Sequence, residues 1–170
     1  QPETHVALDL SGDARSLLIL FGGIAGGVSM PVFEFFRLTA GMPGKKAFLR
    51  DPRRGWYQLG VPGVGPTSQD VRRYLDRVIV EADVDRVVMA GASAGGYAAM
   101  LFGAWCGADH VLAFSPQTFI DAANRAASGD SRWEPQIDHL HASNPPEAVY
   151  DLRDVLSAAS TPRIALHVSN

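Results

Sequence analysis

The segment that most constrains the fold of this chain is Val87–Tyr97, which reads V-V-M-A-G-A-S-A-G-G-Y. It opens with a continuous apolar run, which is typical of a strand buried on both faces. Gly91, Gly95 and Gly96 then surround Ser93, and because glycine has no Cβ, they allow two backbone segments to approach closely. The segment therefore predicts a buried strand, a sharp turn at Ser93 and a helix that begins with small residues.

Short apolar runs alternate with longer amphipathic segments along the rest of the chain, a pattern typical of a parallel sheet covered by helices. We expect strands at Ser16–Phe21, Lys46–Arg50, Asp85–Ala90, His110–Ser115 and Arg163–Val168. We expect helices that begin at Thr67 or Ser68, at Ala94, and at Pro145 or Pro146. Residues 117–143 show weak periodicity and are interpreted as a cap-like excursion within a single domain of residues 1–170. The predicted fold class is α/β, with a mainly parallel sheet flanked by helices.

Composition narrows the class of protein further. The 170 residues are 46% hydrophobic and carry a formal net charge of −3, with a sequence pI of about 5.9. These values argue against a disordered tail and against a basic nucleic-acid-binding domain. Cys106 is the single cysteine, so an intrachain disulfide framework is excluded. No apolar run approaches the length of a membrane span. We expect a cytoplasmic protein with no nucleic-acid or membrane partner.

The turn around Ser93 also carries a chemical motif. The run A-G-A-S-A-G-G-Y-A-A-M resembles the nucleophile elbow of the alpha/beta-hydrolase superfamily, whose motif is G-x-S-x-G between a strand and a helix. The resemblance implies that Ser93 is a catalytic nucleophile, with Gly91, Gly95 and Gly96 shaping the elbow. The alternatives are a glycine-rich turn without chemistry and a serine that only caps the helix.

The same resemblance covers the order of elements from about residue 16 to residue 170. It implies a three-layer sandwich in which Ser16–Phe21 lies beside Asp85–Ala90. It also implies that Lys46–Arg50 lies on the outer side of Ser16–Phe21.

The resemblance further implies an oxyanion hole made of two backbone amides. One amide belongs to Ala94, and the other comes from the loop after the first expected strand, where Gly23 is the first candidate and Ile24 the next. The superfamily often has His-Gly-x there, whereas this chain has Phe21 in place of the histidine, so the match is partial. A plain turn is the alternative. Nucleotide binding is disfavoured, because the G-x-G-x-x-G register fails and Val28 stands where a P-loop needs lysine.

The partners of the serine are missing from the expected positions. Superfamily members present an acid and then a histidine after the serine, but only Ser169 and Asn170 follow the last expected strand. We therefore expect the acid and the base to lie beyond Asn170 and the fold to be C-terminally incomplete. We also expect these 170 residues alone to have little activity. His139 or His141 could serve as the base instead, in an unusual chain order.

The other histidines are weaker candidates. His110 precedes its strand and so falls at the wrong end of the sheet, and His167 lies inside the last strand. His139 and His141 with Asp138 could suggest a metal, but no further ligands support it. We expect no metal and no cofactor.

Several aromatic residues fall in loops near the expected site. Trp56 and Tyr57 follow the second strand in a loop rich in glycine and proline, and Trp133 lies in the excursion. They could line a substrate pocket, or they could simply pack their loops against the domain. Cys106 has no obvious basic neighbour, so we expect a buried, inert thiol.

These observations favour a serine acyl hydrolase that acts on a small-molecule carboxylic ester or thioester. Acyl transfer on the same fold and a non-catalytic binding module of that fold are the alternatives. A sheet that ends at the last expected strand would also have an unpaired edge, which could mediate self-association.

Overall fold

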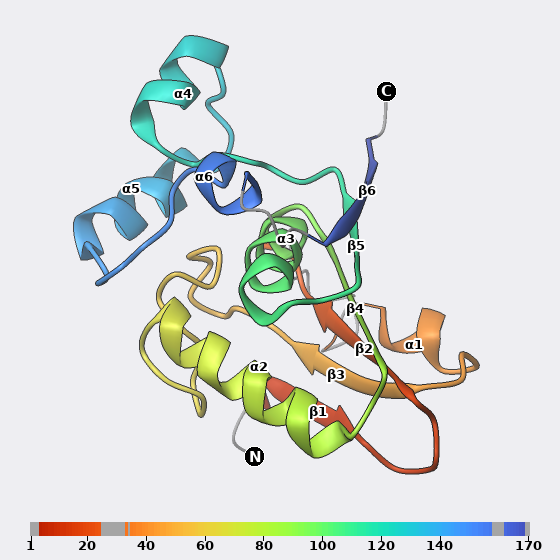
Figure 1. The fold of residues 1–170 in the computed structure, drawn as a ribbon. Helices are drawn as coiled ribbons and strands as arrows, with labels where there is room; N and C mark the ends of the chain where they lie inside the picture. The colour runs from red at the N-terminus through yellow and green to blue at the C-terminus, as the bar shows by residue number, and fades with distance from the viewer. Residues whose placement is uncertain (1–3, 25–32, 34, 158–161, 169–170) are drawn as a thin grey trace.

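A computed structural model describes residues 4–24, 33, 35–157 and 162–168. In these residues the chain forms a six-stranded sheet of order β1-β3-β2-β4-β5-β6 (Figure 1). The strands are β1 (Val6–Asp9), β2 (Ser16–Phe21), β3 (Lys45–Leu49), β4 (Arg86–Ala92), β5 (His110–Phe114) and β6 (Arg163–His167). Strand β1 pairs antiparallel with β3, and the other neighbours are parallel.

The five expected strands are confirmed, with ends that differ by at most two residues. The central position of β2 between β3 and β4 also agrees with the order that the resemblance implied. Strand β1 was not predicted, because its four residues form a short edge strand that is only half-buried or exposed. The mainly parallel α/β sheet is therefore confirmed.

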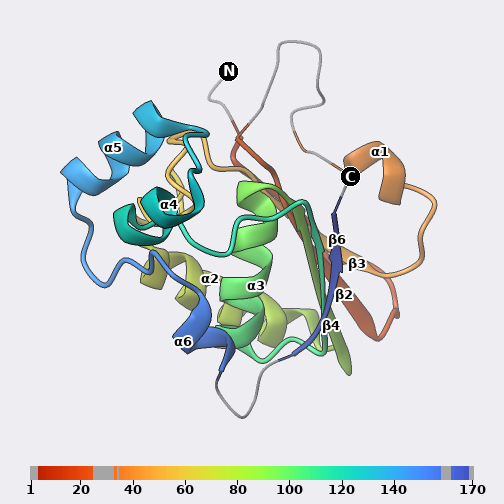
Figure 2. The ribbon, with the colours of Figure 1, turned by 90° about the horizontal axis from the view of Figure 1, so that it is seen from above.

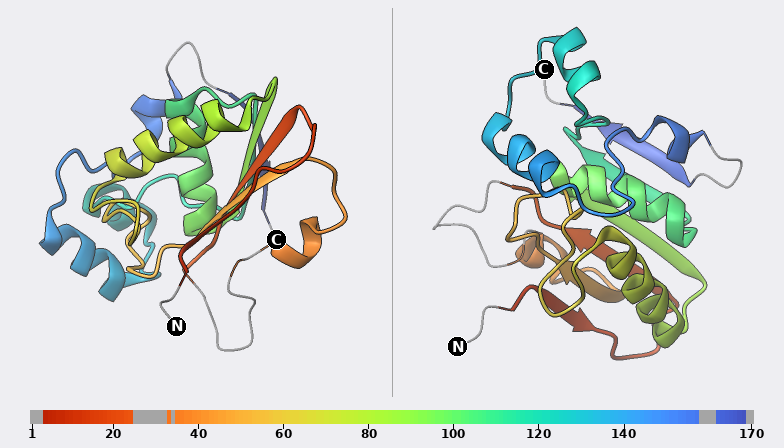
Figure 3. Two further views of the ribbon diagram at one scale, coloured as in Figure 1. Left: turned by 90° about the horizontal axis from the view of Figure 1, so that it is seen from below. Right: turned by 90° about the vertical axis from the view of Figure 1, so that its left-hand side faces the viewer.

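One face of the sheet is covered by two helices, α2 (Ser68–Ala82) and α3 (Ala94–Cys106), as Figures 2 and 3 show. Helix α2 begins where Thr67 caps it: the Thr67 side chain accepts a bond from the Asp70 backbone, and the Asp70 carboxylate accepts one from the Thr67 backbone. Helix α3 is buried over its first ten residues, as expected for a helix that is apolar on all sides.

The opposite face is covered in the described part of the chain by the short helix α1 (Phe36–Thr39). The Phe36 ring lies 5.3 Å from the Phe48 ring of β3, and Leu20, Phe48 and Ala90 form a small buried cluster there. Helices therefore flank the sheet on both sides, as expected for a three-layer sandwich (Figure 2).

Residues 117–143 contain α4 (Ala122–Ser128) and α5 (Glu134–Ser143), which lie to one side of α3 (Figure 1). The helix expected from Pro145 or Pro146 is wrong: the next helix, α6, spans only Arg153–Leu156. The intervening backbone bonds to distant residues instead, since Val149 N donates to Gln58 Oε1 at 2.9 Å. No helix in the described ranges is long and apolar enough to cross a membrane.

Candidate functional site

The turn at Ser93 joins β4 to α3 through a strained backbone. Ser93 has φ 53° and ψ −119°, a region that residues other than glycine seldom occupy and that clusters at functional sites. Its amide donates to Phe114 O at 2.9 Å, and its carbonyl accepts from Tyr97 N at 3.0 Å. Its side chain makes no capping bond to the helix, and the residue is half-buried. The helix-cap interpretation is therefore not supported.

Gly91 and Gly95 are required by close backbone contacts, whereas Gly96 lies in a tight contact with a side chain. A Cβ on Gly91 would lie 2.2 Å from Gly95 O, and a Cβ on Gly95 would lie 2.2 Å from Phe21 O. A Cβ on Gly96 would meet Pro116 Cβ at 3.0 Å. The spacing of the motif thus follows from the contact of β4, α3 and the end of β2.

The start of α3 is suited to hold negative charge. The first amides of a helix have no intrahelical acceptor, and the helix dipole places partial positive charge at the same end. Ala94 is the first residue of this thirteen-residue helix and is 2% exposed. Its N–H group is therefore a suitable donor to an oxyanion beside Ser93.

The loop after β2 lies directly against this helix start. The same Cβ on Gly95 would also lie 2.9 Å from Gly22 O. Gly22 N donates to Leu49 O at 2.9 Å. Gly23 is half-buried and Ile24 is buried. The structure thus brings the two segments proposed for the oxyanion hole together, while Val28 lies outside the described residues.

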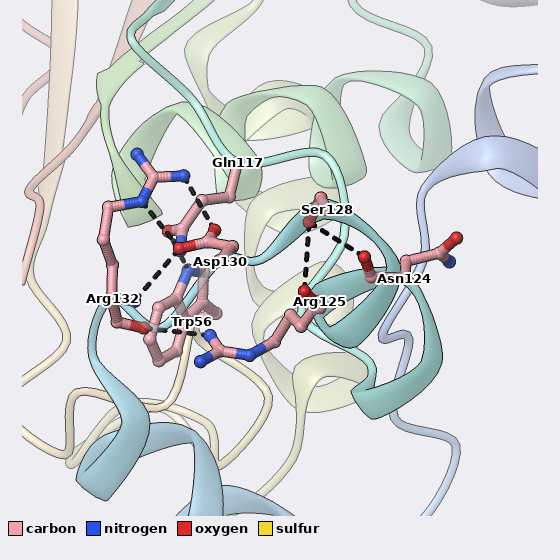
Figure 4. A network of polar contacts seen from close by, with 7 residues as sticks. All are labelled: Trp56, Gln117, Asn124, Arg125, Ser128, Asp130 and Arg132. Carbon is pink, nitrogen blue, oxygen red and sulfur yellow. Dashed lines mark hydrogen bonds and ion pairs between the residues drawn. The ribbon is translucent and has the colours of Figure 1, made fainter.

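The aromatic residues considered for a pocket have different positions. Trp56 and Tyr57 are fully buried, and Trp56 Nε1 donates to Gln117 Oε1 at 3.0 Å (Figure 4). The two residues therefore belong to the core, and a role for them in a substrate pocket stays a prediction. Trp133 is 36% exposed and precedes α5. Its role in a pocket stays a prediction.

None of the described histidines is hydrogen-bonded to Ser93. His110 begins β5, at the opposite end of the sheet from the elbow. His167 ends β6, and its ring stacks on Phe114 at 4.9 Å. His139 is exposed on α5, and His141 packs against a tyrosine ring. Within the described ranges no three His, Cys, Asp or Glu side chains gather as metal ligands.

A cleft of about 370 Å³ lies between α4 and α5 and includes Arg125, Asp130 and His141 in its lining. Asp130 pairs with Arg132 at 2.8 Å (Figure 4). Hydrogen bonding to Arg132 lowers the pKa of Asp130 to about 2. Ser93 is not part of this lining, so the cleft is separate from the elbow.

Cys106 lies at the end of α3 and is half-buried rather than buried, and partial burial, followed by the nearby Asp76 carboxylate, raises the pKa of its thiol. A neutral thiol is a poor nucleophile. The structure therefore favours the inert interpretation of Cys106.

Comparisons with known proteins show the fold and leave the reaction open. No protein-family model matches the chain, and no curated protein sequence matches it. Among solved structures, the glycosylation-associated protein (Gap123) complex of Streptococcus agalactiae is similar at a TM-score of 0.58 and 16% identity. That match covers 99% of this chain but 41% of the other, so the chain spans about two fifths of its length.

Two other solved structures are similar at still lower identity. The capsule O-acetyltransferase of Neisseria meningitidis serogroup A matches at a TM-score of 0.58 and 12% identity, over 96% of this chain and 68% of the other. A fluorophosphonate-binding serine hydrolase of Staphylococcus aureus, FphF, matches at a TM-score of 0.47 and 12% identity, over 92% and 76%. At such identities a likeness concerns the fold alone.

Proposed function

We propose that this chain carries the nucleophile and the oxyanion hole of a serine acyl hydrolase. Ser93 attacks the carbonyl carbon of an ester or thioester, and the amides of Gly23 and Ala94 hold the oxyanion. The observation that carries the proposal is the strained turn at Ser93, a half-buried residue at a helix N-terminus whose side chain does not cap the helix.

The bonds exchanged in this reaction define what the site must supply. The Ser93 Oγ–carbon bond forms, the bond to the leaving alcohol or thiol breaks, and the serine proton passes through a base to the leaving group. Water then reverses these steps and releases the acid. The serine hydroxyl is a weak nucleophile without a base, so the reaction also needs a general base within hydrogen-bond reach of Ser93.

Acyl transfer is the second candidate, and one observation favours it. The fold neighbour from Neisseria meningitidis, at a TM-score of 0.58, is a capsule O-acetyltransferase. The acyl-enzyme would be the same, and an alcohol or amine would take the place of water in the second step. Adding an alcohol to the assay separates the two, because only a transferase forms the new ester in preference to the free acid.

Labelling with a fluorophosphonate tests the proposal, because this probe reacts with an activated serine. The whole polypeptide should be labelled at Ser93, and Ser93→Ala should abolish labelling. Ser115→Ala is a matched control, since Ser115 also has a positive φ, 43°, at the end of the neighbouring strand. Equal labelling of the Ser93→Ala protein, or no labelling of the folded wild type, would show that Ser93 is not a catalytic nucleophile.

A further inference from the structure

The hydroxyl group of Tyr57 contacts the loop that holds the candidate oxyanion donor. The single Tyr57 hydroxyl proton is shared between two carbonyl oxygens, Gly22 O at 3.0 Å and Leu49 O at 3.1 Å from Oη. We propose that Tyr57 is a positioning residue that orients the peptide between Gly22 and Gly23, so that the Gly23 amide can bind an oxyanion. The proposal rests on the proposed function of Ser93.

Peptide geometry connects the Tyr57 contact with the Gly23 amide. The carbonyl of Gly22 and the N–H of Gly23 belong to one planar unit, and a trans peptide directs them to opposite sides. The described part of the chain contains no cis peptide bond. A hydrogen bond that holds Gly22 O on the Tyr57 side therefore directs the Gly23 N–H away from Tyr57.

A contact of this kind is needed because of the sequence of the loop. Consecutive glycines have access to far more backbone conformations than other residues, so a Gly-Gly peptide has little intrinsic preference for one orientation. Oxyanion stabilisation depends on donors that are oriented before the charge develops. The Gly22 N–H is held by Leu49 O at 2.9 Å, and Tyr57 holds the carbonyl of the same residue.

Tyr57 is itself held in an unusual conformation. Arg54, Trp56 and Tyr57 all have positive φ values, at 53°, 51° and 62°, which are costly for residues other than glycine. The Asp51 carboxylate accepts bonds from the amides of Gly55 at 2.7 Å and Tyr57 at 2.9 Å, which keep this loop folded.

The tyrosine ring is fixed as firmly as its backbone. It is fully buried and packs edge-on against Phe21 at 5.4 Å and Phe102 at 6.4 Å. Because the ring is closely packed, the position of its hydroxyl group relative to the loop at Gly22 is fixed.

Tyr57→Phe tests the proposal, with Tyr97→Phe as its matched control. Tyr97 is equally buried, and its hydroxyl also donates to a backbone carbonyl, Val149 O, at 2.7 Å. That carbonyl lies far from the oxyanion loop in the sequence. Tyr57→Phe loses the buried contacts to Gly22 O and Leu49 O, and Tyr97→Phe loses a half-buried hydrogen bond, so both variants should lose some stability.

The readout is ester turnover by the whole polypeptide at a temperature at which both variants are folded. Tyr57→Phe should lower kcat by about tenfold with KM unchanged, since loss of an entire oxyanion donor costs on the order of 10²-fold, whereas Tyr97→Phe should stay within about twofold of wild type. Equal kcat values for the two variants would overturn the proposal. If instead turnover does not depend on Ser93 at all, the proposed function fails, and Ser93→Ala shows this separately.

Asp51→Ala serves as a second variant if Tyr57→Phe does not fold. It keeps the tyrosine hydroxyl but removes the carboxylate oxygen that accepts from the amides of both Gly55 and Tyr57. A lower kcat at unchanged KM supports the positioning role. A wild-type kcat in a folded Asp51→Ala protein contradicts it.

Discussion

Replacing Gly95 by alanine should disturb both the fold and the site. The added Cβ would lie 2.2 Å from Phe21 O, 2.8 Å from Phe21 C and 2.9 Å from Gly22 O. All three atoms belong to the backbone at the end of β2, so no side-chain rotation can relieve the contact. The start of α3 must therefore move away from the sheet, by about 1 Å if ordinary van der Waals separation is to be restored.

The size of the effect follows from two opposing contributions. Overpacking in a well-packed core costs about 1–3 kcal/mol, and a contact between backbone atoms belongs at the upper end of that range. The better helix propensity of alanine offsets at most about 1 kcal/mol. We expect the free energy of unfolding to fall by about 2 kcal/mol.

Urea denaturation measures this change, with Gly41→Ala as the control because a Cβ there would meet nothing within 4 Å. The fluorophosphonate labelling rate of Ser93 should also fall, by about 100-fold, since a displacement of about 1 Å is sufficient to misplace reacting groups. If Gly95→Ala unfolds within about 0.5 kcal/mol of wild type, the close approach of α3 and β2 is not as described.

Three further predictions concern stability and reactivity. Thr67→Ala removes the capping box with Asp70 and should lower the free energy of unfolding by about 1 kcal/mol in urea denaturation. Asp130 has a folded pKa of about 2, below its ordinary 3.8, so its stabilising effect should be complete above pH 3.8 and lost as the pH falls toward 2. Because Arg132 is 67% exposed, the difference between wild type and Asp130→Asn should be about 1 kcal/mol at neutral pH and should vanish in acid; a constant difference contradicts this. Cys106 should react with a thiol reagent far more slowly in the folded protein than in urea, because burial raises its pKa; equal rates would show an exposed thiol.

The strands and the elbow could be predicted from sequence because each depends on local pattern. Strand β2 is buried on both faces, so its continuous run of apolar residues is sufficient to predict a strand. The glycines at 91 and 95 indicate that backbone segments lie close together there, but the sequence does not show which segment contacts each glycine. The structure adds that Phe21 O is the atom that excludes a side chain at Gly95.

The elements that sequence missed depend on distant contacts. The proline pair at 145 and 146 suggested a helix, but the backbone that follows it bonds to Gln58 and Tyr97 rather than to itself. Tyr57 is similar: its aromatic character was visible, whereas the carbonyl that its hydroxyl contacts lies 35 residues earlier in the chain. No local pattern specifies such a partner.

Trapping of the acyl-enzyme tests the role of Ser93 most directly. The whole polypeptide is mixed with an activated acetyl ester, quenched in acid, digested and analysed by mass spectrometry. We predict an initial burst of product and one acetyl group on the peptide that contains Ser93, with neither in Ser93→Ala. Ester turnover with no acetyl group on Ser93, or a burst of equal size in Ser93→Ala, would contradict the assignment of Ser93 as the nucleophile.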